Sequence, residues 1–375
     1  MKGAQSRRRN STIDLMKFLF ALLIVCFHGQ KNLPLGDGLH FFINGRIGVE
    51  FFFIVSGYLM VCSSGRYIRA MESSKDFSIW QNTIDFIKHK IVGLFPNVFL
   101  AWILAFTVVV IGQECTAMQV LRKFFAGLFE CFFIARAGFR GIPSINGATW
   151  YLSAMLIGMS ILFPILVKKR DFYVHWFAPL GSLLLYGFMS SSWDNGMAGS
   201  TMFTGFATKG LLRALGGLLL GAVCYLVAEK LKSVNYRPFM KVLFTLLLTG
   251  SFAFVFRYVY SNKNSSFDFV LVAIIAVGVT LSFANVSYTQ LLNRNALVYH
   301  VCGWLGEFSM NLFLSHGYWS NYLQVFVPGI TGMQLFRIYL AVVFVNAILL
   351  MIVSKLILHY WPAIKGMLYR LCIQE

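Results

Sequence analysis

The stretch that decides the fold is IDLMKFLFALLIVCFHGQ, residues 13–30. It is apolar for most of its length, which predicts a transmembrane helix, yet it carries Asp14 and Lys17 near its start and His28 near its end. Ionisable side chains inside hydrocarbon are costly and mark functional sites. In a helix, the step from Lys17 to His28 gives about 20° of net rotation and roughly 16 Å of rise. We therefore expect both side chains on one face, Lys17 near the membrane surface and His28 deep.

The composition of the chain also indicates a membrane protein. Of its 375 residues, 58% are hydrophobic and 12% are charged, and the mean hydropathy is +0.70. So few charges cannot cover a soluble globule of this length, and we expect an all-α polytopic membrane protein in a lipid bilayer. The formal net charge of +18 lies in short patches between apolar runs, as membrane topology predicts, so we expect no nucleic-acid partner. No His, Cys or carboxylate cluster has metal-ligand spacing, and we expect no metal site.

Apolar runs along the chain predict ten transmembrane helices. They cover residues 13–30, 47–62, 91–112, 148–167, 174–190, 209–228, 241–260, 267–285, 304–324 and 335–356. A further run, Phe124 to Ala135, is short and is bounded by Lys123 and Arg136, which favours a re-entrant or interfacial segment.

The Lys and Arg residues of the connections predict the orientation. With ten spans, most of them fall on the side that also holds the basic tail 1–12 and the tail 357–375, and this side is then the cytoplasm. The longest polar connection, 63–90, is too short to fold alone. We therefore expect residues 1–375 to form a single membrane domain with both termini cytoplasmic.

Several basic residues fall inside or at the edge of these spans. Those near helix ends are expected to reach the headgroups: Lys209, Arg337 and Lys355. Arg213 and Arg257 lie further in, so either could line a polar cavity or neutralise a phosphate.

The second span, IGVEFFFIVSGYLMVC at 47–62, places Glu50 among phenylalanines. Two antiparallel helices joined by a short loop would set Glu50 at the depth of His28. A carboxylate beside an imidazole fixes its tautomer and stabilises the imidazolium, as a catalytic base requires. The alternative is that Glu50 faces water or caps a helix. Two turns deeper, Ser56 and Gly57 indicate close helix packing by small residues.

Five motifs in order resemble those of the integral-membrane acyltransferases called acyltransferase family 3. These are Asp14-x-x-Lys17 followed by His28, GVEFFFIVSGY at 48–58, HKIVGLFPNVFLAW at 89–102, TWYLSAML at 149–156, and LGEFSMNLFLSHGYW at 305–319. Two positions depart from the familiar pattern. Lys17 stands where arginine is often found, which keeps the charge but loses bidentate geometry. Glu307 stands where a basic or neutral residue is common, and the sequence gives no reason for it.

The resemblance implies a multi-pass enzyme of the bacterial cytoplasmic membrane. Such an enzyme moves an acyl group, commonly acetyl, from cytoplasmic acyl-coenzyme A to a hydroxyl of a carbohydrate, lipid-linked glycan or other surface-glycan precursor. Acyl-coenzyme A is then a donor substrate, and no permanently bound cofactor is implied. The expected reaction is O-acetylation, as in polysaccharide modification.

Together, the residues and the resemblance predict a site along the first helix. Lys17 and Asp14, with Arg213 and Arg257, are expected to bind coenzyme A, and His28 oriented by Glu50 is expected to deprotonate the acceptor hydroxyl. A transient acyl-histidine stays open as an alternative.

Four further residues are candidates for the pore or the substrate contact. They are Ser56, Trp150, Tyr151 and His316. The alternatives are an interfacial aromatic belt for Trp150 and Tyr151 and a hydrogen bond to a neighbouring helix for His316.

Two other functions fit intramembrane Lys, His and Glu residues. A transporter or flippase would use them as a substrate or proton path, although the two halves of the chain show no matching broken helices. The second alternative is an inactive homologue that acts as an assembly partner. Lys17 in place of arginine is weak support for this alternative.

Overall fold

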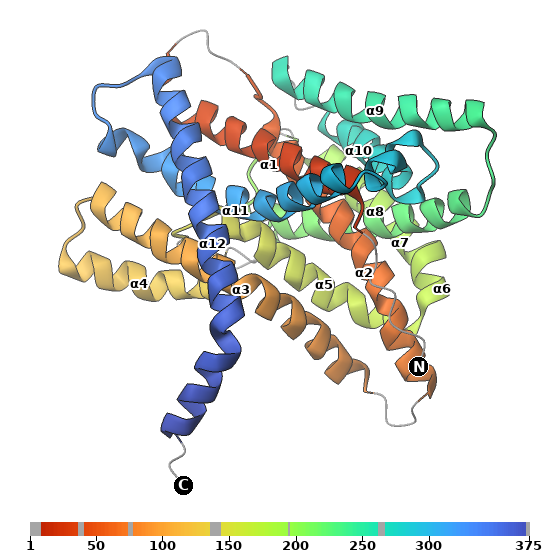
Figure 1. Cartoon of the computed structure of the whole chain (residues 1–375), viewed down its shortest axis with the longest axis horizontal. Coiled ribbons are helices and arrows are strands. Elements are labelled where there is room, and N and C mark those ends of the chain that lie inside the picture. Colours follow the sequence, from red (N-terminus) through yellow and green to blue (C-terminus); the bar gives the residue numbers. More distant parts are fainter. Residues whose placement is uncertain are drawn as a thin grey trace.

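The computed structural model describes residues 9–36, 41–73, 78–135, 144–193, 196–261 and 267–372, with the backbone alone for Ser261 and beyond Tyr360 (Figure 1). Within these ranges the elements are helices, which confirms the all-α prediction. The α-helices are α1 (Ser11–Asn32), α2 (Gly48–Ser73), α3 (Ile79–Gly112), α4 (Ala117–Cys131), α5 (Trp150–Lys168), α6 (Arg170–Phe172), α7 (Ala178–Ser192), α8 (Lys209–Lys232), α9 (Pro238–Ser261), α10 (Asp268–Ala284), α11 (Ala296–Phe326) and α12 (Gly332–Cys372). Short 3₁₀ or π turns are η1 (Gly45–Ile47), η2 (Gly147–Thr149), η3 (Tyr173–Phe177) and η4 (Tyr288–Asn293).

Eight of the described helices are long and apolar enough to cross a membrane, so the chain is a multi-pass membrane protein. They are α1, α2, α3, α5, the α6–η3–α7 segment, α8, α9 and α12. Each of the ten predicted runs overlaps a helix. Two of the ten predicted spans overlap helices outside these eight. They are α10, which is apolar but shorter, and α11, which is long but more polar. The count of ten spans and the cytoplasmic placement of both termini therefore stay predictions.

The run 124–135 lies mainly in α4, a short helix that packs against α3. Its first turn is closed by a capping box in which Thr116 and Gln119 bond each other's backbone N–H groups. Its length of 15 residues is too short for a full span.

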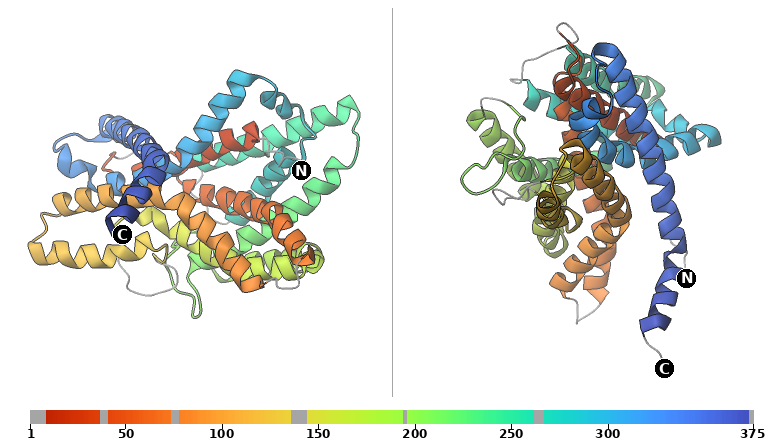
Figure 2. Two further views of the ribbon diagram at one scale, coloured as in Figure 1. Left: turned by 60° about the horizontal axis from the view of Figure 1, so that its bottom comes forward. Right: turned by 90° about the vertical axis from the view of Figure 1, so that its left-hand side faces the viewer.

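The centre of the molecule is formed by α1, α2, α8 and α11. Figure 1 shows α1 beside α11, and the most extensive helix pairs are α1 with α11 and α2 with α8. The free end of α12 extends away from the bundle (Figure 2). Because α1 and α11 come from opposite ends of the chain, a site between them is built by tertiary packing.

Two glycines allow α2 and α8 to approach closely. A Cβ on Gly57 would lie 2.1 Å from the Leu218 carbonyl oxygen, and one on Gly221 would lie 2.2 Å from the Ile54 carbonyl oxygen. Neither oxygen can move without breaking a helix, so both positions require glycine. This confirms the sequence interpretation of Gly57 as a close-packing residue. The contact fixes the register in which α2 and α8 carry Glu50 and Arg213.

Candidate active site

Two cavities lie along α1, one toward each of its ends. The first, with a volume of about 810 Å³, is lined by Asn10, the N-cap of α1, and by Asp14 and Lys17 of α1, and we call it the lysine cavity. The second, of about 330 Å³, is lined by Phe27 and His28, and we call it the histidine cavity. The α1 residues in both follow a spacing of three or four, so one stripe of the helix serves both cavities. Lys17 and His28 therefore share a face but open into different spaces.

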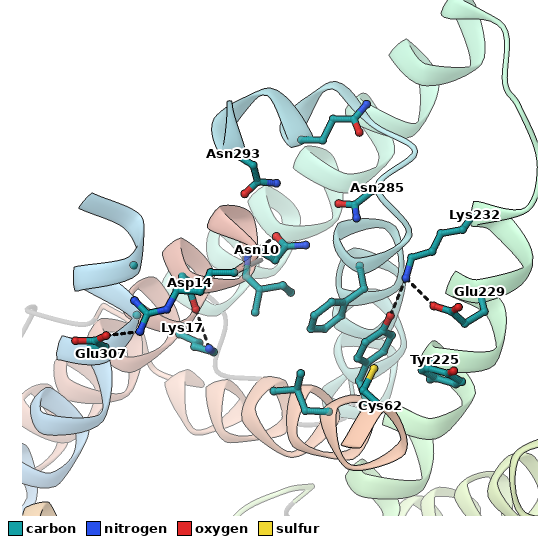
Figure 3. Close-up of a pocket in the computed structure, with 18 of the residues that line it drawn as sticks. Asn10, Asp14, Lys17, Cys62, Tyr225, Glu229, Lys232, Asn285, Asn293 and Glu307 are labelled. Atoms are coloured by element: carbon teal, nitrogen blue, oxygen red, sulfur yellow. Dashed lines mark hydrogen bonds and ion pairs between the residues drawn. The ribbon is translucent and has the colours of Figure 1, made fainter. Parts of the chain in front are cut away.

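Three of the four cations that line the lysine cavity are paired with carboxylates, and Arg9 is one of them through Glu307. The Lys17 ammonium lies 2.8 Å from Asp14, and the Lys232 ammonium lies 2.6 Å from Glu229 (Figure 3). The remaining wall is rich in amides and includes Asn285, Gln290, Asn293 and Arg294. A polyanion entering this space would exchange ion-pair partners with the resident carboxylates.

Glu307, which the sequence left without an explanation, connects three helices at the edge of the lysine cavity. Its carboxylate accepts hydrogen bonds from Arg9, just before α1, and from Lys355 of α12, the latter over 2.8 Å. These bonds tie the start of α1 and the middle of α12 to α11. A neutral residue at this position could not hold two cations.

The histidine cavity brings together two imidazoles from distant parts of the sequence. The ring centroids of His28 on α1 and His316 on α11 lie 4.9 Å apart, and both residues line the cavity. Nδ1 of His316 lies 2.5 Å from the Phe313 carbonyl oxygen. Since a carbonyl only accepts, Nδ1 of His316 is the donor in this contact. His28 is half-buried, whereas His316 is buried.

The structure corrects the expected partner of Glu50. Its carboxylate accepts a bond of 2.6 Å from Nε of Arg213 on α8 and one of 3.1 Å from the Tyr186 hydroxyl, and it is fully buried. The neighbour of His28 is His316 instead of Glu50. The reason is that α2 packs along α8. This brings the guanidinium of Arg213 to Glu50, and a cation compensates a buried carboxylate far better than a neutral imidazole does.

Arg213 lies at the histidine cavity and away from the expected coenzyme A site. Its NH1 donates to the Met197 carbonyl over 2.9 Å, and its guanidinium lies 5.3 Å from the ring of Trp150. Both Arg213 and Trp150 line the cavity. With its donors engaged, Arg213 fixes the loop that carries Met197 and backs the wall of the cavity.

A second ion pair, which is partly buried and which the sequence analysis missed, lies beside the first. Arg46 of η1 lies 3.3 Å from Asp268 of α10, and Asp268 also accepts the Met197 N–H over 2.9 Å. Arg46 lines the histidine cavity, as does Lys31 in the last turn of α1. The signal that could have found Arg46 is its place in NGRIG, directly before the second span.

The loop before α5 forms another part of this wall. Asn146 donates its side-chain N–H to the Leu314 carbonyl over 2.8 Å, and its backbone N–H bonds the buried carboxylate of Glu130 on α4. These bonds hold Gly147 and Ala148 against the cavity. The short helix α4 thus supports the site without lining it.

An aromatic layer borders the histidine cavity, which Phe313 lines, and extends along α2 toward the residues of the lysine cavity. The rings of Phe52, Tyr151 and Phe313 contact one another, with centroids 6.1 Å (Phe52 to Tyr151), 6.4 Å (Phe52 to Phe313) and 5.7 Å (Tyr151 to Phe313) apart. Ser56 lies on the lysine-cavity side of Phe52 along α2, with its hydroxyl 3.5 Å from that of Tyr151. Phe52, Ser56 and Tyr151 line neither cavity. They separate the cavities along α2, whose Val49 lines one and Leu59 the other.

The other basic residues of the spans are placed as follows. Arg257 is exposed on α9 and lines neither cavity, so it is outside the predicted coenzyme A site. Lys209, expected to reach the headgroups, is buried with its ammonium 4.6 Å from the ring of Trp193. Arg337 and Lys355 are exposed on α12.

Comparison with known families gives one match. The family model described as an acyltransferase domain matches residues 10–356. This range includes every residue that lines the two cavities except Arg9, and all helices up to most of α12. No curated protein and no solved structure matched the chain. A match over nearly the whole chain shows that this chain belongs to the acyltransferase 3 family of membrane acyltransferases.

Proposed function

We propose that this acyltransferase moves an acyl group, acetyl in the simplest case, from acyl-coenzyme A in the lysine cavity to a carbohydrate hydroxyl in the histidine cavity. The observation that carries the proposal is the division of one stripe of α1 between two cavities, with Lys17 in one and His28 in the other. Coenzyme A joins a polyanionic end to a thioester by a long slender arm. A cationic space at one end of a helix and a base at the other suit such a donor.

The lysine cavity has the volume and charge for the phosphates of the donor. Four cations line it, namely Arg9, Lys17, Lys232 and Arg294, together with three carboxylates. Phosphates would draw the ammonium groups of Lys17 and Lys232 away from Asp14 and Glu229. Exchange of one anion for another keeps the cations paired in both states.

The arm then has to pass the aromatic layer. The step from Lys17 to His28 is roughly 16 Å along α1. Phe52, whose ring lies 6.1 Å from that of Tyr151, packs against the core cluster that includes Ala21 and Val25 of α1. We propose that the layer excludes water and opens for the pantetheine arm. This places the thioester next to the two imidazoles.

The transfer needs a base, and His28 supplies it in our proposal. The imidazole takes the proton of the acceptor hydroxyl as the oxygen attacks the thioester carbonyl carbon. The carbon–sulfur bond breaks, and the sulfur leaves as the thiolate and takes up the proton to give free coenzyme A. His316 occupies the place beside His28 that the sequence assigned to Glu50, while Glu50 positions Arg213.

The test is an assay of purified protein in lipid nanodiscs with radiolabelled acetyl-coenzyme A and a panel of glycosides. We expect free coenzyme A and labelled glycoside in equal amounts, and loss of both in His28→Ala. A labelled protein in the absence of glycoside would instead support the acyl-histidine route. Solute uptake into vesicles without release of coenzyme A would support a transporter and overturn the proposal.

The location of such a reaction follows from its substrates. Acyl-coenzyme A is a cytoplasmic metabolite, so a bacterial cytoplasmic membrane with the lysine cavity on the cytoplasmic face is the setting that we propose. Labelling of an introduced cysteine near Lys17, from inside or outside of intact cells, tests this orientation.

A further inference from the structure

The charges around the histidine cavity are arranged differently from those around the lysine cavity. Lys31, Arg46 and Arg213 line the histidine cavity, and among the described residues no Asp or Glu does. The carboxylates that compensate the two arginines, Glu50 and Asp268, are fully buried behind them. The wall therefore presents cationic groups inward, with the anionic groups on the far side.

The two arginines differ in how many of their N–H donors are already engaged in hydrogen bonds. Arg213 is 3% exposed and uses Nε, NH1 and NH2 in bonds to Glu50, Met197 and the Arg46 carbonyl. Arg46 is 20% exposed, and among the described residues its side chain makes one long contact, of 3.3 Å to Asp268. Its buried Nε has no hydrogen-bond partner in the part of the chain that the structure describes. A guanidinium has five N–H donors, so Arg46 can bind a further anion.

Lys31 adds a second available cation to the same cavity. Its side chain is exposed, and its ammonium lies 5.9 Å from the ring of Phe27 on the preceding turn of α1. It makes no ion pair with any described carboxylate within 4.0 Å. Lys31 of α1 and Arg46 of η1 thus line one cavity, where two cations can bind the same oxyanion.

The helix ends at the wall of this cavity also favour an anionic ligand. The N-terminal ends of α2 and α5 lie at its wall through Val49 and Trp150, each after a short 3₁₀ turn. A helix N-terminus carries a partial positive charge, and the carboxylate in the first turn of α2, Glu50, is itself paired with Arg213. The C-terminal end of α1 also lies here, but Lys31 in its last turn offsets the negative end.

We infer that the acceptor carries an anionic group, a carboxylate or a phosphate, which Arg46 and Lys31 hold beside the two imidazoles. This inference rests on the proposed function, because it assigns the acceptor to the histidine cavity. With a volume of about 330 Å³, the cavity is at the lower end of the size of small-molecule sites. The anion and the reacting hydroxyl therefore belong to the same sugar or to a sugar and its adjoining phosphate.

The experiment compares probes that differ only in charge. Methyl glucuronoside and methyl glucoside share their ring hydroxyls but differ in a carboxylate, and a short prenyl phosphoglucose supplies a phosphate. With acetyl-coenzyme A as the donor, we expect kcat/KM for one anionic probe to exceed that for methyl glucoside by ten- to hundredfold, which is the effect of one or two charge-assisted hydrogen bonds. The better anionic probe identifies the source of the oxyanion.

The variants test whether Arg46 and Lys31 carry this preference. Arg46→Gln leaves Asp268 without its cation, so the paired change Arg46→Gln with Asp268→Asn keeps the buried charges balanced. Lys31→Gln changes an exposed side chain and does not endanger folding. Each is expected to lower the ratio of kcat/KM between the anionic and the neutral probe toward one. Arg337→Gln, an exposed cation of α12 outside both cavities, is the matched control and should keep the ratio.

A second readout separates this inference from the proposed function. Binding of each probe is measured as the shift in melting temperature that it causes without donor. No release of coenzyme A with any probe contradicts the proposed function, and the melting shifts then decide the anion preference alone. Equal shifts with the charged and the neutral probe, or a preference that survives in all three variants, overturns the inference.

Discussion

The imidazole ring of His28 lies 4.9 Å, centroid to centroid, from that of His316, although the two residues come from opposite ends of the chain. The contact exists because α1 packs along α11. In our proposal His28 takes the acceptor proton, and His316, held by the Phe313 carbonyl, is its neighbour. This arrangement makes specific predictions for both residues.

Replacing His28 by Ala should lower kcat by about 10²- to 10⁴-fold, because proton transfer from the hydroxyl loses its base. His316→Ala should lower kcat as well, and the double variant should be no slower than the His28 variant, since residues that act as a unit are non-additive. The measurement is coenzyme A release in nanodiscs at saturating donor. Additive losses would mean that the two imidazoles act independently.

Removing one partner of the Glu50–Arg213 pair should destabilise the fold. Glu50→Gln leaves a buried guanidinium without its charge partner and should cost about 3–5 kcal/mol. The double variant Glu50→Gln with Arg213→Gln should recover part of this loss. Thermal unfolding in detergent measures it. The exposed pair of Lys232 and Glu229 is the control, and Glu229→Gln should cost about 1 kcal/mol or less.

Lys17 should act on the donor and leave the chemical step unchanged. Lys17→Gln should raise the KM for acetyl-coenzyme A by about tenfold with little change in kcat, because a single phosphate contact is lost. Lys17→Arg should restore or improve the KM, since a guanidinium adds bidentate geometry. Steady-state kinetics at two salt concentrations checks both. An unchanged KM in Lys17→Gln would place the phosphates elsewhere.

The aromatic layer should respond to a larger ring. Phe52→Trp should lower kcat by about tenfold or more, because the arm would be held short of the imidazoles. The donor would still bind in the lysine cavity, so its KM should change little. Phe99→Trp on the exposed face of α3 is the control for the added bulk. A Phe52→Trp enzyme with normal kcat would show that the arm does not pass this layer.

The close contact of α2 and α8 should not tolerate a methyl group. Gly57→Ala places a Cβ 2.1 Å from a backbone oxygen and should destabilise the fold by about 1–3 kcal/mol. Gly250→Ala is the matched change in α9, where a Cβ would meet nothing within 4 Å, and it should be neutral or slightly stabilising. Melting temperatures of the two variants in the same detergent make the comparison.

The helices could be predicted because a span is specified by a local property of the chain. Each of the ten apolar runs in the sequence overlaps a helix of the structure. Eight of these helices are long and apolar enough to cross a membrane, and the other two are α10 and α11. The short run 124–135 was distinguished from the spans by its length and its flanking basic residues, and it lies mainly in the 15-residue helix α4. Hydropathy and length need no knowledge of neighbours.

The partners inside the site could not be predicted in the same way. Glu50 was assigned to His28 because a short loop joins their helices, but its partners are Arg213 on α8 and Tyr186 on α7. Neighbours in sequence need not be neighbours in packing, and a buried carboxylate pairs with the cation that the fold brings to it. Arg257, equally basic in sequence, is exposed and outside both cavities.

The sequence by itself determined that this is an all-α membrane protein, and helical periodicity set Lys17 and His28 on one face of the first helix. Tertiary structure alone decided that this face opens into two cavities, that His316 stands beside His28, and that cations line the smaller cavity with their carboxylates behind them. The physical reason is that spans and faces follow from residues a few positions apart. The site depends on which helices pack together, and glycines such as Gly57 fix that choice by letting backbones touch.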